Sequence, residues 1–86
     1  MKLISYTVKP GEADANVARI EAVFAELARA GLDLRYTVYR DGDRFFHLAD
    51  GDGFSSLPAF RAFLDGHESR RVGATETSEL AVVGSY

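Results

Sequence analysis

The 86-residue chain contains no cysteine and no tryptophan, and it has only two prolines. Without cysteine it can form no disulfide, no thiolate metal site and no cysteine nucleophile. No apolar run approaches the roughly 20 residues that cross a membrane, and the N-terminus lacks the apolar core of a signal peptide. The net charge is −3 without any basic stripe, which gives little support for binding nucleic acid. We therefore expect a cytoplasmic protein without a membrane or nucleic-acid partner.

The residues that are present suffice for one folded domain. Hydrophobic residues make up 47% of the chain, including four tyrosines and six phenylalanines, and this composition excludes a disordered protein. A chain of this length has room for only one core, so we expect a single domain over residues 1–86. A monomer of this size buries only roughly 60–65% of the surface of its unfolded chain, so self-association would add useful burial.

Hydrophobic periodicity predicts an α+β fold with the ferredoxin-like order βαββαβ. The expected elements are a strand over 3–9, a helix over 12–30, strands over 34–40 and 43–49, a helix that Ser56 caps and Gly66 ends, and a last strand over 75–85. Gly31 stands where a left-handed residue would end the first helix. Near the start of that helix, Asn16 is expected to be exposed. The strands should form one antiparallel sheet with both helices on one face.

The central hairpin decides which side chains face the helices. Asp41-Gly42 between two β-rich runs is typical of a two-residue type I′ turn. Counting outward from that turn places Tyr36 opposite His47. Because opposed residues share a face of the sheet, one alternating set should face the helices. That set is Leu34, Tyr36, Val38, Phe45, His47 and Ala49.

The other face of the sheet is predicted to be apolar and uncovered. It would carry Leu3, Thr7, Tyr39, Phe46, Leu48, and either Ala81 or Val83. Contiguous apolar patches of this kind are uncommon on monomers. We therefore expect a homodimer that packs through the open sheet face.

The strongest candidate for chemistry is His47 beside Tyr36. An imidazole with a pKa of about 6.5 can act as a general base, and a phenol can donate a hydrogen bond to a developing oxyanion. The alternative is a histidine that is hydrogen-bonded to tyrosine for structural reasons only. A second cluster, Arg61 and His67 with neighbouring arginines, could bind an anionic substrate at the pocket mouth or form a solvated surface. Neither the histidines nor the aspartates have the spacing of a metal site, so no metal is expected.

Three features together resemble a known family. They are the βαββαβ order, the Lys9-Pro10-Gly11 lead into the first helix, and the pattern Tyr-x-x-x-Arg-Asp-Gly over residues 36–42. In these features the chain resembles the antibiotic biosynthesis monooxygenase-like proteins, which form dimeric α+β barrels. The resemblance implies that His47 occupies the position of a substrate-contacting polar residue.

The resemblance also implies an activity. It suggests a cofactor-independent oxygenase acting on an aromatic or enolisable small molecule. Haem-degrading relatives carry an asparagine on their first strand, where this chain has Ile4, so no cofactor is expected. The predicted apolar walls of the pocket are Tyr6, Phe24, Phe45 and Phe60. The alternative is a non-catalytic binding or structural homodimer on the same fold.

Overall fold

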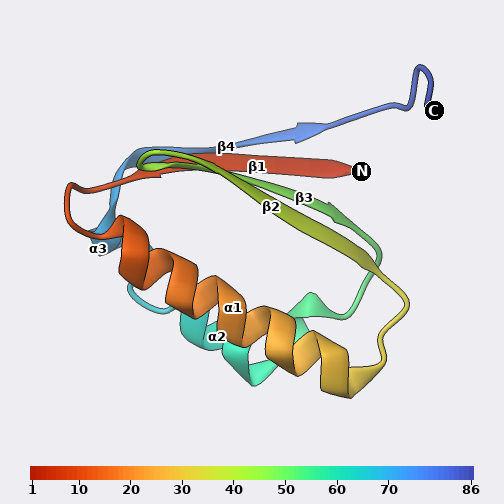
Figure 1. Ribbon diagram of the computed structural model, residues 1–86, viewed down its shortest axis with the longest axis horizontal. Helices are drawn as coiled ribbons and strands as arrows, with labels where there is room; N and C mark the ends of the chain where they lie inside the picture. Colours follow the sequence, from red (N-terminus) through yellow and green to blue (C-terminus); the bar gives the residue numbers. More distant parts are fainter.

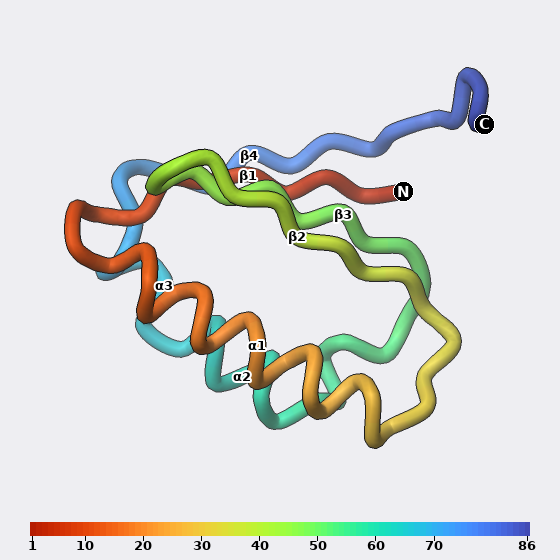
Figure 2. The backbone as a smooth tube through the Cα atoms, viewed as in Figure 1, coloured from red at the N-terminus to blue at the C-terminus, as the bar shows by residue number.

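A computed structural model describes residues 1–86 and confirms the predicted α+β class. The strands are β1 (Lys2–Val8), β2 (Arg35–Asp41), β3 (Arg44–Asp50) and β4 (Arg71–Glu79), and the helices are α1 (Ala13–Ala30), α2 (Pro58–Leu64) and α3 (His67–Arg70), with a 3₁₀ turn η1 (Phe54–Ser56). The sheet has the order β2-β3-β1-β4, and every neighbouring pair is antiparallel. Helices α1 and α2 lie on one side of it, and nothing covers the other side (Figures 1 and 2). No helix is both long and apolar enough to span a bilayer.

The predicted hairpin register was wrong by two residues. The turn is formed by Gly42 and Asp43, so Tyr36 pairs with Ala49 and Val38 pairs with His47. Gly42 has φ 60°, and no residue other than glycine has a positive φ. This combination fits a type II′ turn, which takes glycine first, whereas type I′ needs two positive φ angles. Because the shift is an even number of residues, the predicted faces are unchanged.

Two predictions about helix ends have different outcomes. The first helix ends as predicted at Gly31, which is left-handed with φ 63°. The predicted cap of the second helix was wrong, because the Ser56 hydroxyl donates to the Gly53 carbonyl within η1. The N-terminus of α2 is instead held by α1, since Glu26 Oε2 accepts the backbone N–H of Ala59 at 2.7 Å. A carboxylate at this place also interacts favourably with the helix dipole.

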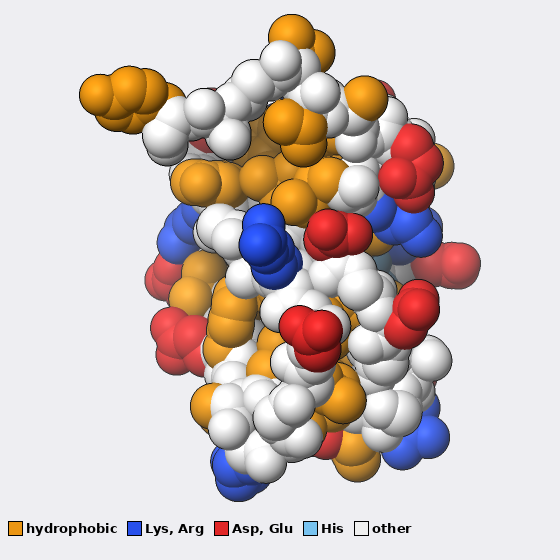
Figure 3. All heavy atoms as spheres, turned by 90° about the vertical axis from the view of Figure 1, so that its right-hand side faces the viewer, with side chains coloured by type: hydrophobic (Ala, Val, Ile, Leu, Met, Phe, Trp, Pro, Cys, Tyr) orange, Lys and Arg blue, Asp and Glu red, His pale blue; other side chains and the backbone are white.

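The last strand was predicted too far along the chain. β4 starts at Arg71, immediately after α3, and stops at Glu79. The pairing with β1 ends here, because Glu79 pairs with Lys2, the first residue of β1, and beyond it only the Leu80 N–H bonds to the Met1 carbonyl. Residues 80–86 therefore project beyond the sheet (Figure 1), with hydrophobic side chains standing out on the segment (Figure 3). Ala81 and Val83 accordingly do not belong to the open face.

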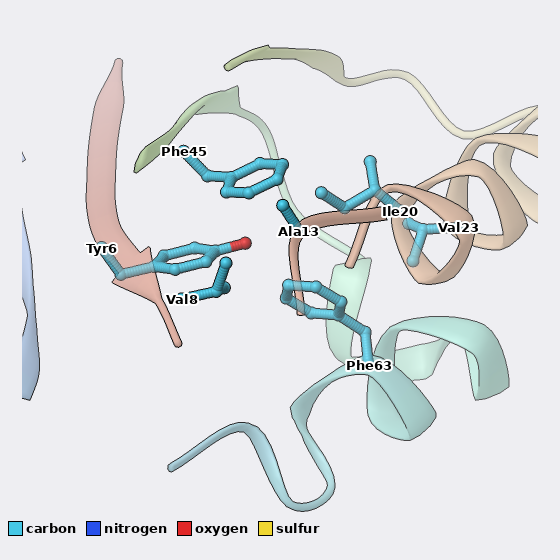
Figure 4. Packing of buried hydrophobic residues seen from close by; sticks show 7 residues of the cluster. All are labelled: Tyr6, Val8, Ala13, Ile20, Val23, Phe45 and Phe63. Carbon is cyan, nitrogen blue, oxygen red and sulfur yellow. The ribbon is translucent and has the colours of Figure 1, made fainter. Parts of the chain in front are cut away.

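The core lies between the sheet and the helices (Figure 4). Tyr6 extends from β1 with its hydroxyl toward the helices, and Phe45 stacks on its ring at 5.7 Å between centroids. Phe63 of α2 packs from the opposite side, so the Tyr6 ring is enclosed by aromatic groups. The full buried cluster is Tyr6, Val8, Ala13, Ile20, Val23, Phe45 and Phe63. This packing fixes the Tyr6 hydroxyl at the edge of a cavity.

Candidate functional site

A cavity of about 470 Å³ opens between the sheet and α2. Every strand contributes to its lining, as do η1, α2 and α3. Its walls are largely apolar and aromatic, with Ile4 on the sheet side and Phe54, Phe60 and Phe63 opposite. Polar side chains converge on the same cavity, and an apolar wall with convergent polar groups is typical of small-molecule sites. The residues that carry the candidate chemistry are Tyr6, Tyr36, His47, His67 and Arg71.

Four polar side chains form a continuous row of hydrogen bonds along one side of this cavity. Tyr36 Oη lies 2.6 Å from His47 Nδ1, and Tyr6 Oη lies 2.7 Å from His47 Nε2. Asn16 Nδ2 donates to Tyr6 Oη at 2.9 Å. The row joins strands β1, β2 and β3 to the first turn of α1. His47 is therefore held at both ring nitrogens, and the hydroxyls of Tyr6 and Tyr36 stand on either side of it.

The direction of these hydrogen bonds can reverse. A neutral imidazole has one N–H donor and one acceptor nitrogen, so the two tyrosine hydroxyls play opposite roles toward His47. In one arrangement Tyr6 donates to Nε2, and Nδ1–H donates to Tyr36. In the other, Tyr36 donates to Nδ1, and Nε2–H donates to Tyr6. The row can thus relay protons without moving any heavy atom: when one tyrosine hydroxyl gains a proton from outside the row, the other releases one, and His47 changes tautomer.

Burial keeps His47 neutral at neutral pH and moves the ionisation of the two tyrosines still further from neutral pH. Desolvation is the main cause that lowers the pKa of His47 to about 4, and the nearby His67 lowers it further. Desolvation likewise raises the pKa of Tyr6 to about 12, against the opposing effect of its hydrogen bond from Asn16. The pKa of Tyr36 is raised for the same main reason. An uncharged row of this kind is suited to relaying protons rather than to holding a fixed ionic charge.

His67 lies next to this row but has a different environment. It is buried, with 5% of its surface exposed, and its ring packs edge-on against Tyr6 at 4.5 Å between centroids. Arg71 Nη1 lies 2.8 Å from His67 Nδ1, and His67 Nε2 has no hydrogen-bond partner. Desolvation lowers the pKa of His67 to about 4, and the positive charges of Arg71, Arg70 and Arg19 act in the same direction.

The structure brings together five of the eight predicted site residues. Tyr6, Tyr36, His47, Phe60 and His67 line the cavity. The other three do not: Phe24 stacks on Tyr36 at 5.0 Å, Phe45 stacks on Tyr6 within the core, and Arg61 is exposed on α2. Lining residues do not by themselves establish roles, so the assignments of base and hydrogen-bond partner stay predictions.

Asn16 was predicted to be exposed, and this was wrong. Only 1% of its surface is exposed. A signal in the sequence could have revealed it, because Asn16 shares a helix face with Ala13, Ile20 and Val23 at steps of three and four residues. A polar residue in that stripe needs a buried partner, which here is the Tyr6 hydroxyl.

No family model and no curated protein matches the chain. Among solved structures, one described as an antibiotic biosynthesis monooxygenase superposes with a TM-score of 0.72 at 13% identity, over 96% of this chain and 98% of that one. A protein from Nitrosomonas europaea, provisionally assigned to the same family, gives 0.74 at 10% identity over 95% and 88%. A Pseudomonas aeruginosa protein gives 0.72 at 18% identity over 96% and 92%. The chain therefore shares, over nearly its whole length, the fold of the antibiotic biosynthesis monooxygenase structures.

Proposed function

We propose that the protein is a small, cofactor-independent oxygenase that acts on an aromatic or enolisable molecule. The observation that carries the proposal is the row Tyr36–His47–Tyr6, whose three members all line one largely apolar cavity. A flat aromatic ligand would pack between Ile4 and the phenylalanines of η1 and α2. The names of the structures with the same fold agree with this activity, although their low identity supports only the fold.

We infer that a tyrosine hydroxyl, which we take to be that of Tyr36, rather than His47 makes the first contact with substrate. Both nitrogens of His47 are engaged by tyrosine hydroxyls, so an acidic substrate proton would pass to Tyr36 Oη while the Tyr36 proton passes to His47 Nδ1. The resulting imidazolium would donate to the oxygens of Tyr36 and Tyr6. The negative charge of the enolate formed beside it would stabilise the imidazolium, and this offsets the desolvation that otherwise disfavours a charged His47.

Oxygen then acts as the oxidant. The enolate gives one electron to O₂, and the two radicals combine into a peroxide that eliminates water. Overall, one CH₂ group and O₂ become one C=O group and H₂O, so the reaction needs no external reductant or bound cofactor. The protein contributes by removing the proton, stabilising the enolate and excluding bulk water from it.

A second candidate is a non-catalytic protein that binds the same kind of molecule. It is favoured by the pKa of His47, since a base whose pKa is about 4 accepts a proton reluctantly in the empty site. The open cavity disfavours a third possibility, a purely structural module whose pocket is filled by its own aromatic residues.

Oxygen uptake by metal-free protein supplied with anthrone tests the proposal. We expect uptake above the spontaneous rate, and His47→Ala should reduce it by about 10²–10⁴-fold with a much smaller effect on affinity. Glu21→Ala, on the exposed side of α1, is the matched control and should keep the full rate. Binding of anthrone without enzyme-dependent uptake would instead identify the second candidate.

We also propose that a second copy of the chain covers the open sheet face. The face carries Phe46 and Leu48, half-buried, and Tyr39 and Val72, which expose 58% and 55% of their surfaces. Light scattering should give about twice the 9.4 kDa mass of the chain. Leu48→Lys should halve that mass, whereas Ala22→Lys on the exposed side of α1 should not. A wild-type protein of single-chain mass at micromolar concentration would contradict the proposal.

A further inference from the structure

The protonation of His67 follows from its contact with Arg71. A guanidinium can only donate hydrogen bonds, so His67 Nδ1 must accept the bond from Arg71 Nη1. A neutral imidazole carries one proton, and that proton therefore sits on Nε2. This N–H is buried in a side chain that lines the cavity, and it has no partner. Buried donors without partners are rare in native proteins and usually indicate a missing ligand or water.

The surroundings of this donor favour an anion. Arg71 lines the cavity beside it, and the bonds to His67 Nδ1 and the Gly73 carbonyl fix the guanidinium while leaving its other N–H groups available. Lys2 also lines the cavity, and the charges of Arg70 and Arg19 act on His67 from behind. The one acidic lining residue, Glu68, is exposed and at the rim.

We propose that His67 and Arg71 form a subsite for an anionic oxygen, so that the ligand is an aromatic molecule with a carboxylate at one end and an ionisable hydroxyl or enol at the other. The carboxylate would accept from His67 Nε2–H and from Arg71, and the hydroxyl or enol would meet Tyr36 and Tyr6. The residues that would meet the two ends line the same cavity. This inference rests on the proposed function, because it assumes that the cavity binds a small aromatic molecule.

Calorimetry with two matched probes at pH 7.5 tests the subsite. The probes are 2-naphthol and 6-hydroxy-2-naphthoate, which differ only in the carboxylate at the far end of the ring system. We expect the naphthoate to bind about tenfold more tightly, because its carboxylate would add one charge-assisted hydrogen bond. His67→Phe, which keeps a ring against Tyr6 and Phe63, should abolish this preference while leaving the affinity for 2-naphthol nearly unchanged.

Further variants separate a donor from a packing role. His67→Gln restores an N–H group and should recover part of the preference for the naphthoate. Arg71→Met, which keeps the length of the stem, should reduce that preference and serves as the second variant if His67→Phe fails to fold. Equal affinities of the wild type for both probes would overturn the subsite alone. If neither probe binds, the proposed function fails with it.

Discussion

His47 and His67 are both buried, both line the same cavity, and both have a pKa lowered to about 4. Their hydrogen bonds nevertheless differ. His47 is held at both nitrogens by neutral tyrosines, so it can pass a proton along a row. His67 is held at one nitrogen by a cation and keeps a free N–H at the other. We infer that the partners of a buried histidine, rather than its pKa, decide whether it is suited to relaying protons or to donating to a ligand.

The largest expected effect is on the kinetic constants, because a variant of the row should change kcat and a variant of His67 should change KM. Tyr36→Phe removes the hydroxyl that would contact the substrate and should lower kcat by about 10²–10³-fold with little change in KM. For a substrate that carries the carboxylate, His67→Phe removes a binding donor and should act mainly on KM. Steady-state oxygen uptake measures both constants. If both variants changed only KM, the two histidines would share a binding role and the relay would be wrong.

An effect of intermediate size is expected in the pH dependence of the free energy of unfolding. An unfolded histidine has a pKa of about 6.5, so between pH 6.5 and 4 the unfolded chain binds more protons than the native protein. Stability is therefore complete above pH 6.5 and falls as the pH falls toward 4. For His47 the loss is about 3 kcal/mol, and His67 adds to it in the same direction. Urea unfolding at several pH values measures the loss.

The two histidines can be separated in the same experiment. His67→Phe should remove the contribution of that ring and leave that of His47. Proton NMR of the imidazole rings should give titrations well below pH 6.5 for both residues in the wild type. A stability that stays constant from pH 7 to 5 would contradict the burial of both rings.

The smallest expected effect concerns Asn16, which is connected through the Tyr6 hydroxyl to His47 and makes no hydrogen bond to His67. Asn16→Ala withdraws a buried hydrogen bond from Tyr6 and should cost about 1–3 kcal/mol of unfolding free energy. The naphthoate preference at His67 should persist in this variant. Urea denaturation provides the measurement, with Glu21→Ala as an exposed control on the same helix. A cost equal to that of the control would show that Tyr6 does not depend on Asn16.

The fold could be predicted well because it depends on local patterns. Gly31 and the apolar stripe defined the first helix, and the alternation along β2 and β3 defined the faces of the sheet. The hairpin register could not be fixed, because glycine at residue 42 suits either of two turns that are one residue apart. The end of β4 depended on where β1 begins, which no pattern within residues 75–85 contains.

The candidate site was predicted only in part. His47 and Tyr36 were placed on one face by alternation, although the prediction treated Tyr6 as an apolar wall. Its hydroxyl bonds to His47 across 41 residues of sequence, a contact that depends on the pairing of β1 with β3. The free N–H of His67 could not be predicted from the sequence either, because it follows from the position of Arg71 in the fold. Such contacts arise from tertiary packing and leave no periodic signal.

The contact between Glu26 and Ala59 has a consequence for how the ligand range of this protein could evolve. With seven residues, α2 is too short to be stable alone, and its first turn is held by a carboxylate on α1. Because α2 carries Phe60 and Phe63, that one contact helps to set the width of the cavity. Glu26 does not line the cavity, so we expect a substitution there to loosen the aromatic wall without replacing any lining residue. The range of ligands could therefore change while the row Tyr36–His47–Tyr6 stays as it is.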